Sequence, residues 1–202
     1  MPGLLEALLG GDAEAVEQVR SHAGIDDAKR AEQAHAAAVG TILRGLEAKS
    51  QTEEGAGSIW EMLRKQVEQG NVPAEAPSQG RGGVQVRDMD PKVANDIMKV
   101  IFGKDAPEVQ GGFGKVITLD PETTQKVFEK VLPAVLGGIF GAAEKDPQES
   151  PQALPKVLGD ARKEMEQRQP KSTGIFEAIL DRDHDGDVDL EDLAGIFAPK
   201  PR

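Results

Sequence analysis

The sequence predicts an all-α protein, a multihelical bundle built from two homologous helical units and followed by a short C-terminal helix–loop–helix. Three observations support this prediction. Apolar residues recur with helical spacing along most of the 202 residues, and no stretch alternates for long enough to form a substantial strand. A pattern of residues in the first half returns in the second half. Near the C-terminus, acidic residues alternate with other residues around a glycine.

The helical periodicity and its interruptions divide the chain into elements. Asp26, Asp90 and Asp120 are predicted N-caps, because a carboxylate before the first turn accepts hydrogen bonds from free backbone amides. Pro91 and Pro121 suit the first helical position, where no amide hydrogen is needed. Helices are therefore predicted near residues 3–9, 12–22, 27–48, 57–69, 91–102, 106–115, 121–144, 152–167, 174–180 and 190–196.

The remaining stretches are predicted to connect these helices. They are rich in Gly, Pro, Ser and Gln, and they span residues 49–56, 70–89, 145–151 and 168–173. Residues 70–89 form the longest of them and are predicted to be a linker or surface loop. Two short pieces, 84–86 and 116–117, have the composition of extended chain.

An internal repeat relates residues 4–16 (LLEALLGGDAEAV) to residues 97–109 (IMKVIFGKDAPEV), an offset of 93 residues. One residue is then gained, so that Ile25 matches Leu119. The next residue, Asp26, matches Asp120, and the offset then returns to 93. Two units, at about 3–69 and 90–167 with a linker at 70–89, are the simplest explanation of this match. The alternative is chance similarity between amphipathic helices.

The long helices of the two units match in two adjacent apolar rows, with residues spaced by four along each row. Adjacent rows give each helix a broad apolar face, which must be buried, so we expect the units to pack through these faces. Gly40 matches Pro133, and both are expected weak points at the same height of their helices. One row contains Ala34, Ala38, Ile42 and Leu46 against Val127, Val131, Val135 and Ile139; the other contains His35, Val39 and Leu43 against Phe128, Leu132 and Leu136.

These segments resemble the bacterial YidB-like family, the domain of unknown function numbered nine hundred and thirty-seven. The resemblance is carried by residues 97–109, by residues 117–145 and by the degenerate first copy at 23–63, and it covers about residues 1–160. It implies a compact multihelical domain over 1–168, and it implies no activity because the family has none assigned. Members often end in a short DxDxDG-type segment, which fits the tail of this chain.

The tail carries the predicted chemistry of the chain. With Asp181 at position 1, acids occupy positions 1, 3, 5, 7, 9 and 12 of a twelve-residue loop, and Gly186 at position 6 permits its sharp turn. Calcium prefers six to eight oxygen ligands at about 2.3–2.6 Å, which such a loop supplies. We predict a helix–loop–helix of EF-hand type at 174–198 that binds Ca²⁺ through Asp181, Asp183, Asp185, Asp187, Asp189 and Asp192.

Position 12 of this loop departs from the usual pattern. Asp192 stands where Glu is usual, and its shorter side chain weakens a bidentate contact. We therefore predict weak calcium binding, with a Kd on the order of 10⁻⁵ to 10⁻³ M, and Mg²⁺ as an alternative occupant. The competing interpretation is an acidic turn that caps the following helix and holds no ion.

Composition excludes several classes of function. The chain has no Cys, which removes disulfides, thiolate nucleophiles and zinc–thiolate sites. A net charge of −11 without a basic stripe argues against nucleic acid as a partner. The longest nearly apolar stretch, 131–143, is shorter than the ~20 residues that span a bilayer, and the N-terminus lacks the basic region of a signal peptide. We expect a soluble, cytoplasmic protein.

No catalytic constellation emerges from the remaining residues. His22, His35 and His184 do not form one, and His35 is predicted to be buried because it matches the core-facing Phe128. No Ser lies in a recognisable nucleophile motif. We therefore predict no catalytic residues and no cofactor beyond Ca²⁺. The predicted function is that of a non-enzymatic interaction or scaffold protein, with a protein partner or self-association. The alternative is an enzyme with a carboxylate-containing pocket between the two helical units.

Overall fold

The computed structural model describes residues 13–73, 88–144 and 151–168. All regular elements in these ranges are helical, which confirms the predicted all-α class. The helices predicted at 3–9, 174–180 and 190–196, and the extended piece at 84–86, lie outside the described residues. The elements are α2 (Ala13–Ala23), α3 (Ala28–Ser50), α4 (Glu53–Glu68), α5 (Pro91–Phe102), η1 (Gly103–Asp105), α6 (Ala106–Ile117), α7 (Pro121–Glu144), η2 (Pro151–Ala153) and α8 (Leu154–Arg168).

The Asp-Pro pairs set the starts of α5 and α7, as the sequence predicts. Asp90 accepts a hydrogen bond from the Lys92 amide at 2.8 Å, and Asp120 accepts one from the Thr123 amide at 3.0 Å. Each carboxylate thereby satisfies an amide that has no partner inside the helix. The predicted starts of both helices are confirmed, and so is the end of α5 at Phe102.

Two other helix starts differ from the prediction. The N-cap of α3 is Asp27 and not Asp26, since Asp27 accepts the Arg30 amide at 2.9 Å. Helix α4 begins at residue 53, inside the stretch that was predicted to be a connection. Its cap is Thr52, whose hydroxyl accepts the Gly55 amide at 3.0 Å. A capping side chain followed by acids in the first turn therefore outweighs the poor helix propensity of the glycines there.

The ends of α2 and α6 share a C-terminal cap. Gly24 has φ 71° and Thr118 has φ 61°, so each helix is followed by a residue in the left-handed region. The amide of the next residue bonds back into the last turn, at 2.9 Å for Ile25 and 2.8 Å for Leu119. The sequence match of these two residues thus has a structural counterpart. Residues 116–117, predicted to be extended, are instead the last residues of α6.

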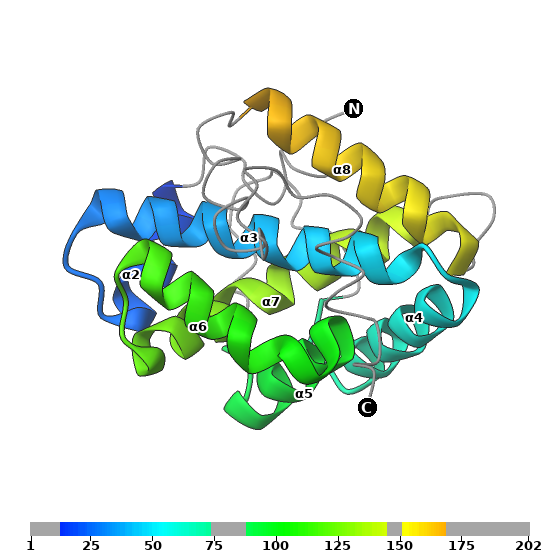
Figure 1. Cartoon of the computed structure of the whole chain (residues 1–202), viewed down its shortest axis with the longest axis horizontal. Helices are drawn as coiled ribbons and strands as arrows, with labels where there is room; N and C mark the ends of the chain where they lie inside the picture. Colours follow the sequence, from blue (N-terminus) through cyan, green and yellow to red (C-terminus); the bar gives the residue numbers. More distant parts are fainter. Residues whose placement is uncertain (1–12, 74–87, 145–150, 169–202) are drawn as a thin grey trace, which may run out of the picture.

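Helices α3 and α7 lie side by side at the centre of the described bundle (Figure 1). Helix α2 packs on both of them, and α6 also packs on both. Helix α5 contacts both central helices, α4 packs on α3, and α8 lies along α3. Both apolar rows predicted on the central helices are buried, which confirms that these faces form the core.

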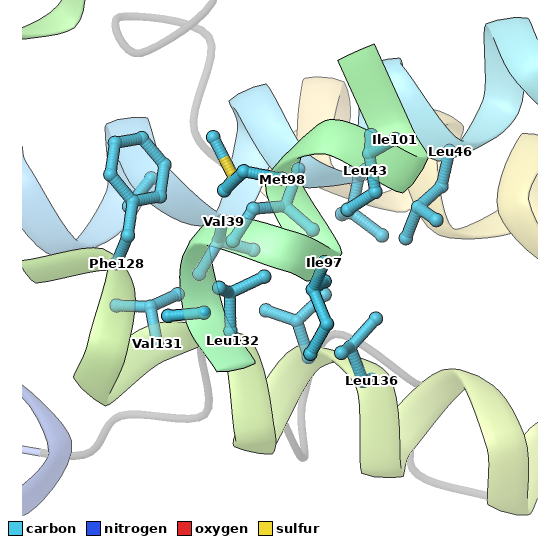
Figure 2. Close-up of a cluster of buried hydrophobic side chains, with 14 of the residues drawn as sticks. Val39, Leu43, Leu46, Ile97, Met98, Ile101, Phe128, Val131, Leu132 and Leu136 are labelled. Carbon is cyan, nitrogen blue, oxygen red and sulfur yellow. The ribbon is translucent and has the colours of Figure 1, made fainter. Parts of the chain in front are cut away.

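The side chains of α5 fill the space between the two central helices (Figure 2). The α5 side chains that form this cluster are each no more than 1% exposed, and so are the side chains of α3 and α7 that they face. Burying one large apolar side chain contributes about 1.5–3 kcal/mol, so this cluster is a main source of stability. Its members include Ile97, Met98 and Ile101 from α5, Leu43 and Leu46 from α3, and Leu132 and Leu136 from α7.

Gly45 lets the C-terminal end of α5 approach α3. A Cβ atom at this position would lie 2.4 Å from a ring carbon of Phe102 and 2.7 Å from a methyl carbon of Ile101, which is closer than real Cβ contacts. One turn further along α3, the Lys49 ammonium donates to the Val100 carbonyl in the last turn of α5. A cation at this end of a helix is favourable, because the final carbonyls lack helical partners.

Helix α7 continues through Pro133, so the expected weak point does not end it. Proline has no amide hydrogen, and the carbonyl of Glu129, four residues earlier, therefore has no helical donor. The amide of Met89 donates to this carbonyl at 3.3 Å. The side chain of Met89 is 4% exposed, so the chain that leads into α5 is anchored on α7.

An aromatic pair joins α4 to α7. Trp60 stacks on Phe140 with ring centroids 5.5 Å apart and an interplanar angle of 21°. Phe140 is buried, and Trp60 is partly buried against the core. Offset stacking of this kind contributes about 0.5–1.5 kcal/mol beyond the area that it buries.

Candidate functional site

The predicted calcium loop lies outside the described residues, together with all six of its candidate ligands: Asp181, Asp183, Asp185, Asp187, Asp189 and Asp192. Calcium binding at this loop therefore stays a prediction. In the described ranges, no group of three or more His, Cys, Asp or Glu side chains is arranged to hold a metal ion. None of the helices in the same ranges is long and apolar enough to cross a membrane.

Helix α8 is the last described element before that loop, and it is held firmly on the bundle. Arg162 of α8 forms an ion pair with Glu47 of α3, with Nε 3.1 Å from Oε2. The two side chains are 31% and 20% exposed, so the pair is less screened by water than a surface pair. The buried side chains of α8 that pack on the core are Leu154, Leu158, Ala161 and Met165.

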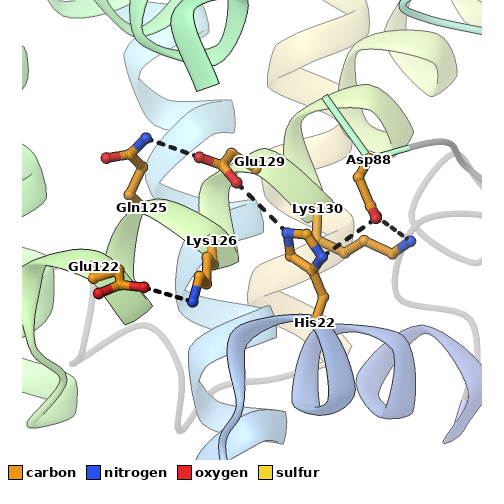
Figure 3. Close-up of polar contacts among 7 residues, drawn as sticks. All are labelled: His22, Asp88, Glu122, Gln125, Lys126, Glu129 and Lys130. Atoms are coloured by element: carbon orange, nitrogen blue, oxygen red, sulfur yellow. Dashed lines mark hydrogen bonds and ion pairs between the residues drawn. The ribbon is translucent and has the colours of Figure 1, made fainter. Parts of the chain in front are cut away.

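The polar cluster that stands out in the described residues is built around His22, in the last turn of α2 (Figure 3). Its Nδ1 lies 3.3 Å from Oδ2 of Asp88, and its Nε2 lies 3.5 Å from Oε2 of Glu129. Lys130 Nζ donates to the other oxygen of Asp88 at 2.8 Å. Gln125 Nε2 donates to the other oxygen of Glu129 at 2.8 Å.

The electrostatics of this cluster favour the charged form of Asp88. The pKa of Asp88 is lowered, chiefly by the hydrogen bond from Lys130 and to a smaller extent by the charge of His22. The side chain of Glu129 is 8% exposed, and a carboxylate so deeply buried needs nearby donors or positive charge. The two carboxylates face opposite nitrogens of the imidazole, so they do not converge on one point. The arrangement is therefore suited to joining segments and not to coordinating an ion.

The cluster of His22, Asp88 and Glu129 was not predicted from the sequence. Asp88 and Glu129 are distant from His22 in the sequence, and no local motif marks any of the three. Only the packing of α2 on α7 brings them together. The burial predicted for His35 is confirmed, at 8% exposure. Burial lowers the pKa of this histidine to about 4.

Neither the curated proteins nor the solved structures contain a match to this chain. A family described as "Bacterial protein of unknown function (DUF937)" matches residues 4–141. The match includes both copies of the repeated pattern and extends from before α2 into the last turns of α7. The YidB-like name and the C-terminal EF-hand loop stay predictions. The chain belongs to the DUF937 family of bacterial proteins of unknown function.

Proposed function

We propose that this protein is a calcium-binding helical protein whose bundle serves as a non-enzymatic interaction or scaffold module. The observation that carries the calcium part is the spacing of acids in residues 181–192. Seven acids and one Arg give this segment a net charge of −6, which strongly favours a bound cation. Gly186 stands where the sharp turn of the loop requires it. Magnesium is the alternative occupant, because Asp192 supplies a shorter arm than Glu.

The packing between the central helices supports a scaffold more than an enzyme. A substrate site requires a cleft with a few convergent polar groups. Where α3 faces α7, the rows instead consist mainly of apolar side chains, each no more than 2% exposed. The alternative, an enzyme with a carboxylate-containing pocket between the two helical units, would need polar groups along this seam. The side chains concerned include Ala38, Val39, Ile42, Leu43, Val131, Leu132, Val135 and Leu136.

The proposal includes duplication of a helical unit, and the helix bounds support it. Helices α2 and α6 form a first pair and α3 and α7 a second, and the second pair starts at residues 28 and 121, an offset of 93. Asp27 and Asp120 cap the second pair at the same offset. The first pair ends in equivalent left-handed residues, Gly24 and Thr118. A repeated unit of this kind offers similar surfaces twice, which suits a protein partner or self-association.

Net charge limits the partners that the proposal includes. At a net charge of −11, the surface repels phosphate backbones, so nucleic acid is not a partner in this proposal. We propose a cytoplasmic location, in which magnesium competes with calcium for the loop.

Calorimetric titration of the full chain tests the calcium site. Wild type is expected to bind one Ca²⁺ per chain with a Kd on the order of 10⁻⁵ to 10⁻³ M. Asp181→Ala removes the ligand at position 1 and should weaken binding by at least about tenfold. The matched control is Glu191→Gln, which removes an equal charge from a non-ligating position of the same loop and should change the Kd by less than about threefold. Equal heats from wild type and Asp181→Ala would remove the site.

Position 12 offers a change in the opposite direction. Asp192→Glu restores the longer side chain that binds Ca²⁺ through both oxygens, so the Kd for calcium should fall by about tenfold while that for magnesium changes less. The same titration, repeated with MgCl₂, measures both constants. An unchanged calcium Kd in this variant would mean that residue 192 does not contact the ion.

A further inference from the structure

We propose that His22 is a proton-dependent clasp, which joins α2 and α7 to the chain entering α5 when both of its ring nitrogens carry protons. The proposal is independent of the calcium loop. It rests on the geometry of the His22 cluster, on the backbone hydrogen bond of Met89, and on the partial exposure of the ring.

Both nitrogens of the His22 ring face carboxylate oxygens. Asp88 lies 3.3 Å from Nδ1, and Glu129 lies 3.5 Å from Nε2, each from a different segment of the chain. A neutral imidazole has one donor and one acceptor, so it can satisfy only one of these carboxylates and turns a lone pair toward the other. A protonated imidazole carries a positive charge that attracts both carboxylates, although the buried Nε2 makes no hydrogen bond at its 3.5 Å distance from Glu129. The ring thus lies between two carboxylates that only its protonated form attracts together.

The charges around the ring point in the same direction. With a neutral ring, the carboxylates of Asp88 and Glu129 outnumber the ammonium of Lys130, for a net charge of −1 in the cluster. With a protonated ring, the net charge is zero. Lys126 of α7 also attracts Glu129 but forms its ion pair with Glu122, at 2.8 Å (Figure 3).

On α2 itself, the nearest cation is already engaged in an ion pair. Arg20 pairs with Glu17 at 2.7 Å, so it does not take the place of His22 between the two carboxylates. The side chain of His22 is 24% exposed, which allows its ring to exchange protons with water.

The clasp holds Asp88 and Met89, the two residues that contact α7 shortly before α5 begins. Glu129 uses its carboxylate for His22 and its backbone carbonyl for the Met89 amide, which donates at 3.3 Å. That carbonyl is available because Pro133 cannot bond to it. Asp88, one residue before Met89, contacts both His22 and Lys130. Loss of the ring proton therefore weakens the contacts of His22 with Asp88 and with Glu129. Asp88 belongs to the segment that enters α5, and Glu129 holds the next residue of that segment through its carbonyl.

Urea unfolding of the full chain at pH 5.5 and pH 8.5 tests the clasp, because an imidazole changes its charge between these values. We compare wild type with His22→Gln, and His35 contributes equally to both proteins. The ratio of their folding equilibrium constants should be roughly threefold to tenfold larger at pH 5.5, as expected for partly exposed ion pairs. The control, Lys156→Gln, breaks the exposed pair with Asp160 on α8 and should show no difference between the two pH values.

A local measurement separates the clasp from a general effect on stability. The hydrogen-exchange protection factor of the Met89 amide, corrected for the intrinsic exchange rate, should fall from pH 5.5 to pH 8.5 in wild type by roughly the same threefold to tenfold. In His22→Gln and in Glu129→Gln it should be low at both values. Equal ratios of folding constants at both pH values, or a Met89 protection factor that does not respond to pH, would overturn the proposal.

Discussion

His35 shows how a single buried side chain sets the response of the protein to acid. It lies on α3 in the row that faces the core, and its exposed fraction is 8%. Burial disfavours the charged ring and lowers its pKa from 6.5 to about 4. In the unfolded chain, the same ring binds a proton below pH 6.5. The unfolded state thus binds more protons between these values, so the free energy of unfolding falls as the pH drops from 6.5 towards 4.

Replacing this ring should remove that acid sensitivity. His35→Leu has a side chain of similar size and no titrating group, so its stability should exceed that of wild type by up to about 3 kcal/mol near pH 4, relative to the difference at pH 7. Urea midpoints measured at pH 7, 6, 5 and 4.5 follow the difference. The same comparison in the His22→Gln background, which retains His35, removes any contribution of His22 to the difference. Parallel pH profiles for wild type and His35→Leu would show that the ring titrates normally in the folded protein.

The contrast between the two histidines also shows what sequence can predict about single residues. His35 could be placed in the core because it matches Phe128 in the second copy of the repeat. His22 has no such match, and its partners Asp88 and Glu129 come from segments that meet only after α2 packs on α7. Tertiary proximity of this kind leaves no local pattern, and the cluster was therefore missed.

At the scale of elements, prediction succeeded where the chain itself specifies the helix ends. Asp-Pro pairs set the starts of α5 and α7, because the N-cap Asp and the Pro at the first helical position both act within the first turn. It failed at the start of α4, where two glycines and a serine stand among the residues 53–58. There, Gly55 is required since its Cβ would lie 1.9 Å from the Lys49 carbonyl oxygen, a contact between two helices. Such a glycine resembles a linker residue in the sequence.

Two glycines inside helices provide a matched test of this reasoning. Gly45→Ala places a Cβ against the buried ring of Phe102 and should destabilise the protein by about 1–3 kcal/mol. Gly57→Ala, in α4, meets nothing within 4 Å and should stabilise it by about 0.5–1 kcal/mol, because alanine has the higher helix propensity. Urea unfolding followed by circular dichroism gives both values. Equal effects of the two substitutions would contradict the close packing of α5 on α3.

At the scale of the whole molecule, the bundle is arranged around two long helices, each crossed by both α2 and α6. The sequence predicted this core because the apolar rows of α3 and α7 are continuous and match each other. The relation between the bundle and the calcium loop could not be derived from spacing, because the loop pattern specifies its own ligands and nothing about what it packs against. The effect of calcium on the stability of the bundle can be measured instead.

Thermal unfolding with and without calcium measures the coupling between loop and bundle. If the ion binds only the folded chain, calcium at a hundredfold over Kd adds about 2.7 kcal/mol, and the Tm of the cooperative transition should rise by several degrees compared with chelator. Asp181→Ala should melt at the same temperature in both solutions. Identical midpoints for a wild-type protein that binds calcium would mean that the bundle unfolds independently of the tail.

The stacking of Trp60 on Phe140 has an optical consequence. The chain contains one Trp and no Tyr, so its near-ultraviolet emission comes from a single indole that reports the contact between α4 and α7. A calcium-dependent shift in the wavelength of maximum emission would mean that ion binding rearranges the contact between α4 and α7. An unchanged emission maximum together with a higher Tm would mean that the ion stabilises the protein without rearranging this contact. Emission spectra with and without calcium thus distinguish a calcium sensor from a protein that the ion only stabilises.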